Sequence, residues 1–190
     1  MKTFLIASIA LTAASVSQAE PATYRSDPSH TSVYFEIKHL GTSTVRARFD
    51  KKEGMVTLDR VAKTGQVEFT VDTASISSGI ATFDTHLRSK DFFNVAEAPT
   101  AKFTGDKLSF NGDKLSAVTG TLTLLGKTHP VTMTATNFNC YEHPMLKREV
   151  CGGDFETTLA RSQWGMTYGL AYGTPDNVKL VAQVEAIKQQ

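Results

Sequence analysis

The chain has 190 residues, which suits one domain with a substantial core, and it carries 20 Lys and Arg against 19 Asp and Glu, for a formal net charge of +1. No long block of charge is present, which argues against nucleic acid as a partner, because binding a polyanion needs a basic face. The same balance argues against electrostatic docking on anionic lipid.

The first 19 residues are predicted to be a secretory signal peptide. Lys2 supplies a basic start, residues 4–14 form an apolar stretch too short to span a bilayer, and residues 17–19 form a small-x-small cleavage site. We expect cleavage after Ala19, which leaves a mature chain of about 170 residues with no net charge. The less favoured alternative is that this segment is a membrane anchor.

Residues 24–49 open with a turn signal and then form two strands, separated by a Leu-Gly break at 40–41. Apolar side chains alternate with polar ones in both strands, which is typical of an antiparallel sheet with one buried face. The apolar positions are Val33, Phe35, Ile37, Val45, Ala47 and Phe49.

The alternation continues in two further strands, at 55–59 and 66–71, with short polar turns at 50–54 and 59–65. Their inward positions are Val56, Leu58, Val67, Phe69 and Val71.

Residues 73–98 depart from the period of two and contain the helical segment that the sequence predicts. Ser77 or Ser78 is its candidate N-cap, and Pro99 ends the region. A short turn is expected at 91–94. The apolar face of the helix consists of Ile80, Phe83 and Leu87.

Strand patterns return at Thr100. Turns are expected at 105–106 and 126–127, and Asn-Gly-Asp at 111–113 is a strong hairpin signal. A Gly-rich connection at 169–177 precedes the closing strand. The expected strands are 100–104, 107–110, 115–125, 131–135, 155–159 and 178–187, with inward residues that include Phe103, Leu122, Leu124 and Met133.

About eight one-sided strands and one helical insertion predict an all-β fold, an eight-stranded antiparallel barrel that leaves no exposed edge. A barrel of this size is either filled by its own side chains or holds one small ligand. Small residues on the inward faces leave volume in the middle, but small residues interleaved with large ones in a filled core fit the pattern equally well.

No set of residues predicts catalysis or a metal site. Asp27, Ser29 and His30 are neighbours in sequence, but neighbours along a strand point to opposite faces, and no G-x-S-x-G motif exists. A metal site built from His39, Asp84, His86 and Asp91 has poor spacing. Gly152-Gly153 alone is a weak signal for a phosphate loop.

Two other features leave alternatives open. Cys140 and Cys151 are an even pair in an exported chain, which favours a disulfide over a redox pair or a metal site with His143. Trp164, the single tryptophan, is either a plug in the core or a lid over a ligand.

Five motifs in order resemble the YceI-like family of bacterial periplasmic proteins, over about residues 24–187. They are D-P-x-H-T-S-V-x-F-x-I-x-H-L-G at 27–41, S-I-S-S-G at 75–79, D-x-H-L-R-S-x-D-F-F at 84–93, P-T-A-K-F at 99–103 and L-T-L-L-G-x-T-x-P-V at 122–131. The segment P-M-x-K-x-E-V-C-G-x-D at 144–154 resembles the subgroup that carries a cysteine pair here.

The resemblance implies that residues 20–190 form a single YceI-like domain, an extended lipocalin-like barrel located in the periplasm. It implies an elongated hydrophobic pocket that binds a polyisoprenoid or a similar long-chain amphiphile, such as a prenyl quinone or acyl lipid. It also implies a possible homodimer, and it supplies no catalytic residues. The expected partner is therefore a lipid and not a nucleic acid, and no cofactor is expected apart from that lipid.

The inward faces define the predicted lipid-binding residues, and Phe83 and Leu87 in the helical segment would close one end. Polar residues at the mouth would meet the lipid head group. The predicted pocket residues are Val33, Phe35, Ile37, Phe49, Val67, Phe69, Phe83, Leu87, Phe103, Leu122, Leu124 and Met133, and the head-group candidates are His39, Asp84, His86 and Arg88. Two alternatives remain: a lipid-modifying enzyme that uses His86 or His39, and a stress-induced structural barrel without ligand.

Overall fold

The structure is a computed structural model that describes residues 20–190; the predicted signal peptide, residues 1–19, lies outside the described residues. None of the helices in residues 20–190 is long and apolar enough to cross a membrane. The strands are β1 (Ala22–Ser26), β2 (Ser32–His39), β3 (Ser43–Phe49), β4 (Lys52–Asp59), β5 (Thr64–Asp72), β6 (Ile76–Ser77), β7 (Thr100–Asn111), β8 (Lys114–Leu124), β9 (Lys127–Glu142), β10 (Glu149–Ala160) and β11 (Asn177–Lys188). The helices are α1 (Ala81–Arg88) and the 3-10 turns η1 (Thr73–Ser75), η2 (Arg161–Trp164) and η3 (Leu170–Tyr172).

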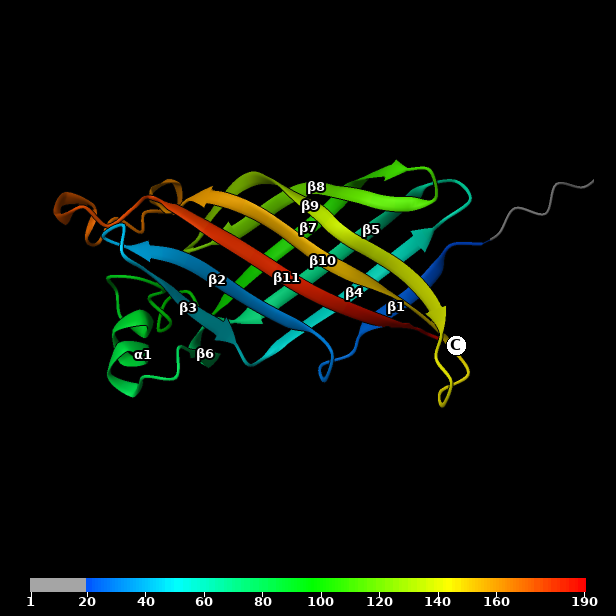
Figure 1. Cartoon of the computed structure of the whole chain (residues 1–190), viewed down its shortest axis with the longest axis horizontal. Helices are drawn as coiled ribbons and strands as arrows, with labels where there is room; N and C mark the ends of the chain where they lie inside the picture. The colour runs from blue at the N-terminus through cyan, green and yellow to red at the C-terminus, as the bar shows by residue number, and fades with distance from the viewer. Residues whose placement is uncertain (1–19) are drawn as a thin grey trace, which may run out of the picture.

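Eight of these strands close into an antiparallel barrel in the order β1, β4, β5, β7, β8, β9, β10 and β11, and β11 returns to β1. The barrel is elongated, with α1 at one end and the C-terminus at the other (Figure 1). The prediction of an eight-stranded lipocalin-like barrel with one helical insertion is confirmed. Closure pairs the edges of the sheet, so the backbone donors and acceptors of these strands face each other and not solvent.

On the edge opposite β10, β11 pairs with two different strands along its length. Its C-terminal end pairs with β1, through Tyr24↔Lys188 and Ser26↔Ala186. Its N-terminal half pairs with β2, and β3 and β6 extend the wall beyond β2. The sequence did not predict β1, because this strand is short and ends next to a turn signal.

Residues of two expected turns belong to strands. β4 begins at Lys52, so the turn predicted at 50–54 is confined to residues 50–51: Gly54 pairs with Phe69, and a Cβ at Gly54 would lie 2.4 Å from the Phe69 ring. β7 continues through the turn predicted at 105–106, where a register shift between Gly105 and Lys107 marks a bulge. A bulge bends a strand without ending it, and in sequence it resembles a turn.

α1 is held by side chains that the sequence did not assign to this role. Its N-cap is Ile80, which makes no side-chain capping bond, so the predicted serine cap is wrong. Instead the Ser78 backbone N and Oγ donate to the Asp84 carboxylate at 2.7 and 2.5 Å, and these bonds lower the pKa of Asp84. Arg88 donates to the carbonyl oxygens of Ala74 and Ile76 at 2.8 and 2.6 Å, which ties α1 to η1 and β6.

The disulfide joins Cys140 of β9 to Cys151 of β10, as predicted. The two residues are direct partners in the register of the two strands, with their Cα atoms 4.1 Å apart. Cys151 is buried in an apolar cluster with Tyr24, Leu115 and Phe138. The bond therefore fastens the barrel wall at the end far from α1.

Candidate ligand-binding cavity

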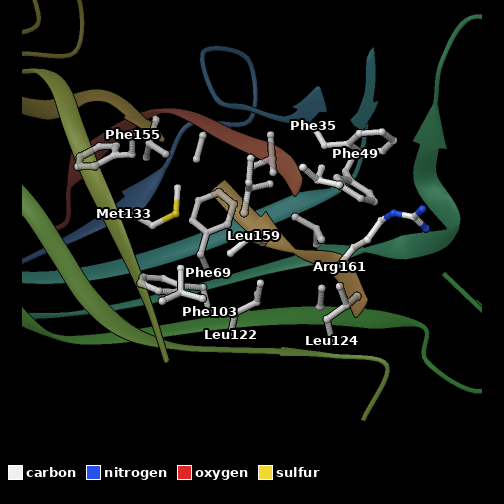
Figure 2. A pocket seen from close by; sticks show the side chains of 18 of the residues that line it. Phe35, Phe49, Phe69, Phe103, Leu122, Leu124, Met133, Phe155, Leu159 and Arg161 are labelled. Atoms are coloured by element: carbon white, nitrogen blue, oxygen red, sulfur yellow. The ribbon is translucent and has the colours of Figure 1, made fainter. Parts of the chain in front are cut away.

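The barrel encloses a cavity of about 450 Å³ that is lined almost entirely by apolar side chains. This volume lies within the usual range for small-molecule sites. Aromatic and aliphatic side chains from facing strands point into the same space, as the rings of Phe69, Phe103 and Phe155 show in Figure 2. The barrel is therefore hollow, and the filled barrel that the sequence also allowed does not describe it.

The buried apolar residues form three clusters around this cavity. One lies beside α1 and includes Phe35, Phe49 and Leu87, and another lies at the disulfide end and includes Tyr24. The third contains Leu122 and packs against members of both others, so it lies between the two ends. The cavity consequently extends along the barrel rather than across it.

All of the predicted pocket residues line the cavity. They come from β2, β3, β5, α1, β7, β8 and β9, and each strand contributes alternate positions, as the period of two requires. They are Val33, Phe35, Ile37, Phe49, Val67, Phe69, Phe83, Leu87, Phe103, Leu122, Leu124 and Met133. Their contact with a ligand stays a prediction.

The disulfide end of the cavity is closed by buried side chains. Tyr24 is 2% exposed, and its hydroxyl donates to the carboxylate of Glu149, whose other oxygen accepts from Arg60 Nη1 at 3.1 Å. Burial, together with the bond to Glu149, raises the pKa of Tyr24 above its ordinary value. At this end a ligand would therefore meet a hydrocarbon surface and Tyr24, whose hydroxyl is already bonded to Glu149.

The α1 end carries the exposed part of the lining. Lys38, His39 and Tyr168 line the cavity and are exposed. His86 also lines it and packs edge-on against Phe92 and Tyr168, with ring centroids 4.9 Å apart in both pairs. Its Nε2 lies 3.2 Å from Asp91 Oδ2. The mouth of the cavity is therefore at this end, where α1 and the loop after β10 meet the end of β2.

The four head-group candidates separate into two pairs. His39 and His86 line the mouth. Asp84 and Arg88 lie outside the cavity, in a polar groove beside η1 and β6, and both are occupied by the bonds that hold α1. The helical spacing placed Asp84, His86 and Arg88 in one segment but did not show which face of α1 looks into the barrel.

Sequence reasoning missed Arg161, which lines the cavity and is only 5% exposed. Its Nε donates to the Pro175 carbonyl oxygen and its Nη1 to that of Met166, each at 3.0 Å. Arginine after a strand, in a polar segment, ordinarily indicates a surface loop. The loop through residue 175 folds back over this side chain, and no local pattern predicts that contact.

Trp164 belongs to the wall of the cavity. It is 2% exposed, and its Nε1 donates to the Leu122 carbonyl oxygen at 3.2 Å. The His129 ring packs edge-on against it. Of the two alternatives for this tryptophan, the structure supports the buried core residue.

Asp27, Ser29 and His30 come together, which corrects the expectation that they point apart. They lie in the turn between β1 and β2, not within a strand. Ser29 Oγ donates to Asp27 Oδ1 at 2.6 Å, and His30 Nδ1 lies 2.7 Å from Asp27 Oδ2 and 3.2 Å from Ser29 Oγ. Both contacts of His30 use the same ring nitrogen, so no relay passes through the imidazole as it does in a hydrolytic triad.

The structure supports neither the phosphate loop at Gly152-Gly153 nor the metal site among the described residues. Gly152 and Gly153 lie within β10, where a Cβ on either would come within 2.0 Å of a carbonyl oxygen of a neighbouring strand. They therefore permit close backbone approach and do not form a phosphate loop. In the part of the chain that the structure describes, no group of three His, Cys, Asp or Glu is placed to hold a metal ion.

The fold and the cavity define a class: an extended, lipocalin-like β-barrel with an elongated apolar interior. The family model of the YceI-like domain matches residues 24–186, so the chain belongs to the YceI-like family. A relative in Pseudomonas aeruginosa, a UPF0312 protein, is 35% identical over 175 residues, which are 90% of each chain.

Solved structures show the same fold. BcnA of Burkholderia cenocepacia matches with a TM-score of 0.70 at 22% identity, over 84% of this chain and 98% of BcnA. A polyisoprenoid binding domain from Saccharophagus degradans, implicated in plant cell wall breakdown, matches with a TM-score of 0.58 at 14% identity, over 90% of this chain and 100% of that domain.

Proposed function

We propose that this protein is a periplasmic carrier that holds a long-chain isoprenoid or a similar amphiphilic lipid, such as a prenyl quinone, in the barrel. The observation that carries the proposal is the apolar cavity of about 450 Å³, closed at the disulfide end and lined by exposed polar residues only at the α1 end. This shape suits a molecule with a long hydrocarbon tail and one polar end.

Burial of hydrocarbon alone supplies enough free energy for such a complex. Each methylene group removed from water contributes about 0.8 kcal/mol, so ten of them contribute about 8 kcal/mol. Before the cost of association, this corresponds to a dissociation constant of about 1 μM. A charged anchor is therefore not needed to hold the tail.

Three further observations support the proposal. The chain is a member of the YceI-like family, and one solved barrel with this fold is a polyisoprenoid binding domain. The predicted signal peptide fits a periplasmic location. Apart from histidines, Lys38, Arg161, tyrosines and Thr174, the cavity lining is almost entirely apolar, which suits burial of a hydrocarbon tail.

Native mass spectrometry tests this function. The full chain, with its signal peptide, is expressed and purified from the periplasm, and the intact mass is measured before and after organic extraction. A stoichiometric adduct that extracts as a prenyl or acyl species is the expected result, and the same spectra report whether the protein is a monomer or a homodimer. A protein that carries no adduct, and takes up none on incubation with prenyl lipids and quinones, would refute the carrier function.

A further inference from the structure

Arg161 has one hydrogen-bond donor that the fold leaves unused. Its Nε and Nη1 are bonded to the carbonyl oxygens of Pro175 and Met166, but its Nη2 is buried and has no hydrogen-bond partner among residues 20–190. No other buried side-chain nitrogen or oxygen in these residues lacks a partner. Native proteins pair nearly all such groups, so an orphan donor on a residue that lines the cavity points to a partner that the protein alone does not supply.

The carboxylate of Asp176, whose charge acts on Arg161, is hydrogen-bonded to Ser162 and not to Arg161. Asp176 accepts from the Ser162 backbone N and Oγ at 2.8 and 2.7 Å. Burial lowers the pKa of Arg161, and the charge of Asp176 opposes that shift. A guanidinium nevertheless stays protonated at neutral pH, so a positive charge lies in the cavity wall.

The ionisable side chains that line the cavity, tyrosines aside, are all basic. The ionisable lining residues other than tyrosine are Lys38, His39, His86 and Arg161, and in the described part of the chain no Asp or Glu lines the cavity. Among the lining side chains drawn in Figure 2, the nitrogens of Arg161 stand at one end, and the labelled side chains around them are hydrocarbon except for the sulfur of Met133. A low-dielectric cavity wall whose ionisable groups are basic favours binding of a ligand with an oxygen acceptor and disfavours binding of a positively charged ligand.

We propose that Arg161 Nη2 donates to an oxygen acceptor on the polar end of the bound lipid, so that the preferred ligand ends in a carboxylate, phosphate or carbonyl and not in an amine. The inference rests on the proposed function. The two bonds to backbone carbonyls fix the plane of the guanidinium, so the third donor is oriented before the ligand arrives. Pre-orientation of a donor lowers the entropic cost of the bond.

Two probes with the same tail and opposite head groups test this inference. Hexadecanoic acid and hexadecylamine are titrated into delipidated protein, and binding is followed by the fluorescence of Trp164, the only tryptophan, which lines the cavity. The wild type is expected to bind the acid at least about tenfold more tightly, because hydrogen bonds to charged groups are the strong ones. This measurement needs no variant and therefore does not depend on whether a variant folds.

Arg161→Met is then expected to abolish the preference, with the affinity for the acid falling about tenfold or more and the affinity for the amine unchanged or higher. Arg88→Met is the matched control, because Arg88 also bonds two backbone carbonyls near the mouth but lies outside the cavity. Its loss should change both affinities by the same factor.

Equal binding of both probes by the wild type, or an equal loss of both in Arg161→Met, would overturn the inference and leave Arg161 as an anchor of its loop, with the carrier function intact. Failure of the wild type to bind either probe, together with an adduct-free native mass, would instead overturn the carrier function itself.

Discussion

Leu122→Trp is the change that distinguishes a hollow barrel from a filled one most directly. Leu122 is 8% exposed and lies in the middle cluster with Val131, Met133 and Trp164, where it lines the cavity. In a filled core, insertion of an indole would cost about 1–3 kcal/mol or more through overpacking. In the hollow barrel the ring enters existing space, so we expect a change in the free energy of unfolding below about 1 kcal/mol.

The same ring would obstruct the cavity halfway along. An indole occupies roughly the length of five methylene groups of an extended chain, and their exclusion costs the ligand about 4 kcal/mol. This loss is about a thousandfold in the dissociation constant. Stability and binding should therefore separate in this variant: the protein stays folded and the ligand is lost.

Urea unfolding of the delipidated protein and titration with hexadecanoic acid measure the two quantities. Thr121→Trp is the control. Thr121 immediately precedes Leu122 in β8, is exposed, and points to the outer face of the barrel. It should change neither quantity appreciably. A loss of several kcal/mol of stability in Leu122→Trp, with Thr121→Trp unaffected, would refute the hollow barrel.

Three further predictions concern stability. Replacement of both cysteines by serine should lower the free energy of unfolding by about 3 kcal/mol, from the closure of a loop between residues 11 apart, as measured by urea unfolding without reductant against the wild type with its disulfide intact. The bonds from His30 and Ser29 hold the pKa of Asp27 at about 2 in the folded state, against 3.8 ordinarily. Its stabilising contribution is therefore full above about pH 4 and is lost as the pH falls through 2, and Asp27→Asn should flatten the pH dependence of stability in that window. Gly120→Ala should cost about 3 kcal/mol, because a Cβ there would lie 2.0 Å from the Thr104 carbonyl oxygen, and thermal unfolding equal to wild type would contradict this geometry.

Strands that keep a strict period of two were predictable from sequence. Phe35, Phe69 and Leu122 all face inward as their alternation indicates, because one face of each strand is solvated and the other is buried. The register of two strands against each other carries no such signal. The bulge in β7 and the start of β4 at Lys52 therefore escaped prediction, since Gly-Asp and charged residues also occur in turns.

The candidate site was predictable on its apolar side and only in part on its polar side, where His39 and His86 line the mouth as predicted but Tyr24 and Arg161 were missed. Tyr24 and Arg161 both line the cavity, yet each lies next to a turn or loop whose course depends on distant segments: β11 and Glu149 for Tyr24, and residue 175 for Arg161. Burial of a polar side chain follows from these tertiary contacts and not from local pattern. Only a folded chain shows that Arg161 retains a free donor.

A cavity that is closed at the disulfide end and has its mouth beside α1 imposes an order on exchange. For the proposed lipid, the tail would enter first and leave last, so a protein or membrane that delivers or receives the molecule would meet its polar end. Asp84 and Arg88 hold α1 at this mouth from outside the cavity, so weakening their bonds is expected to shorten the time for which cargo is retained.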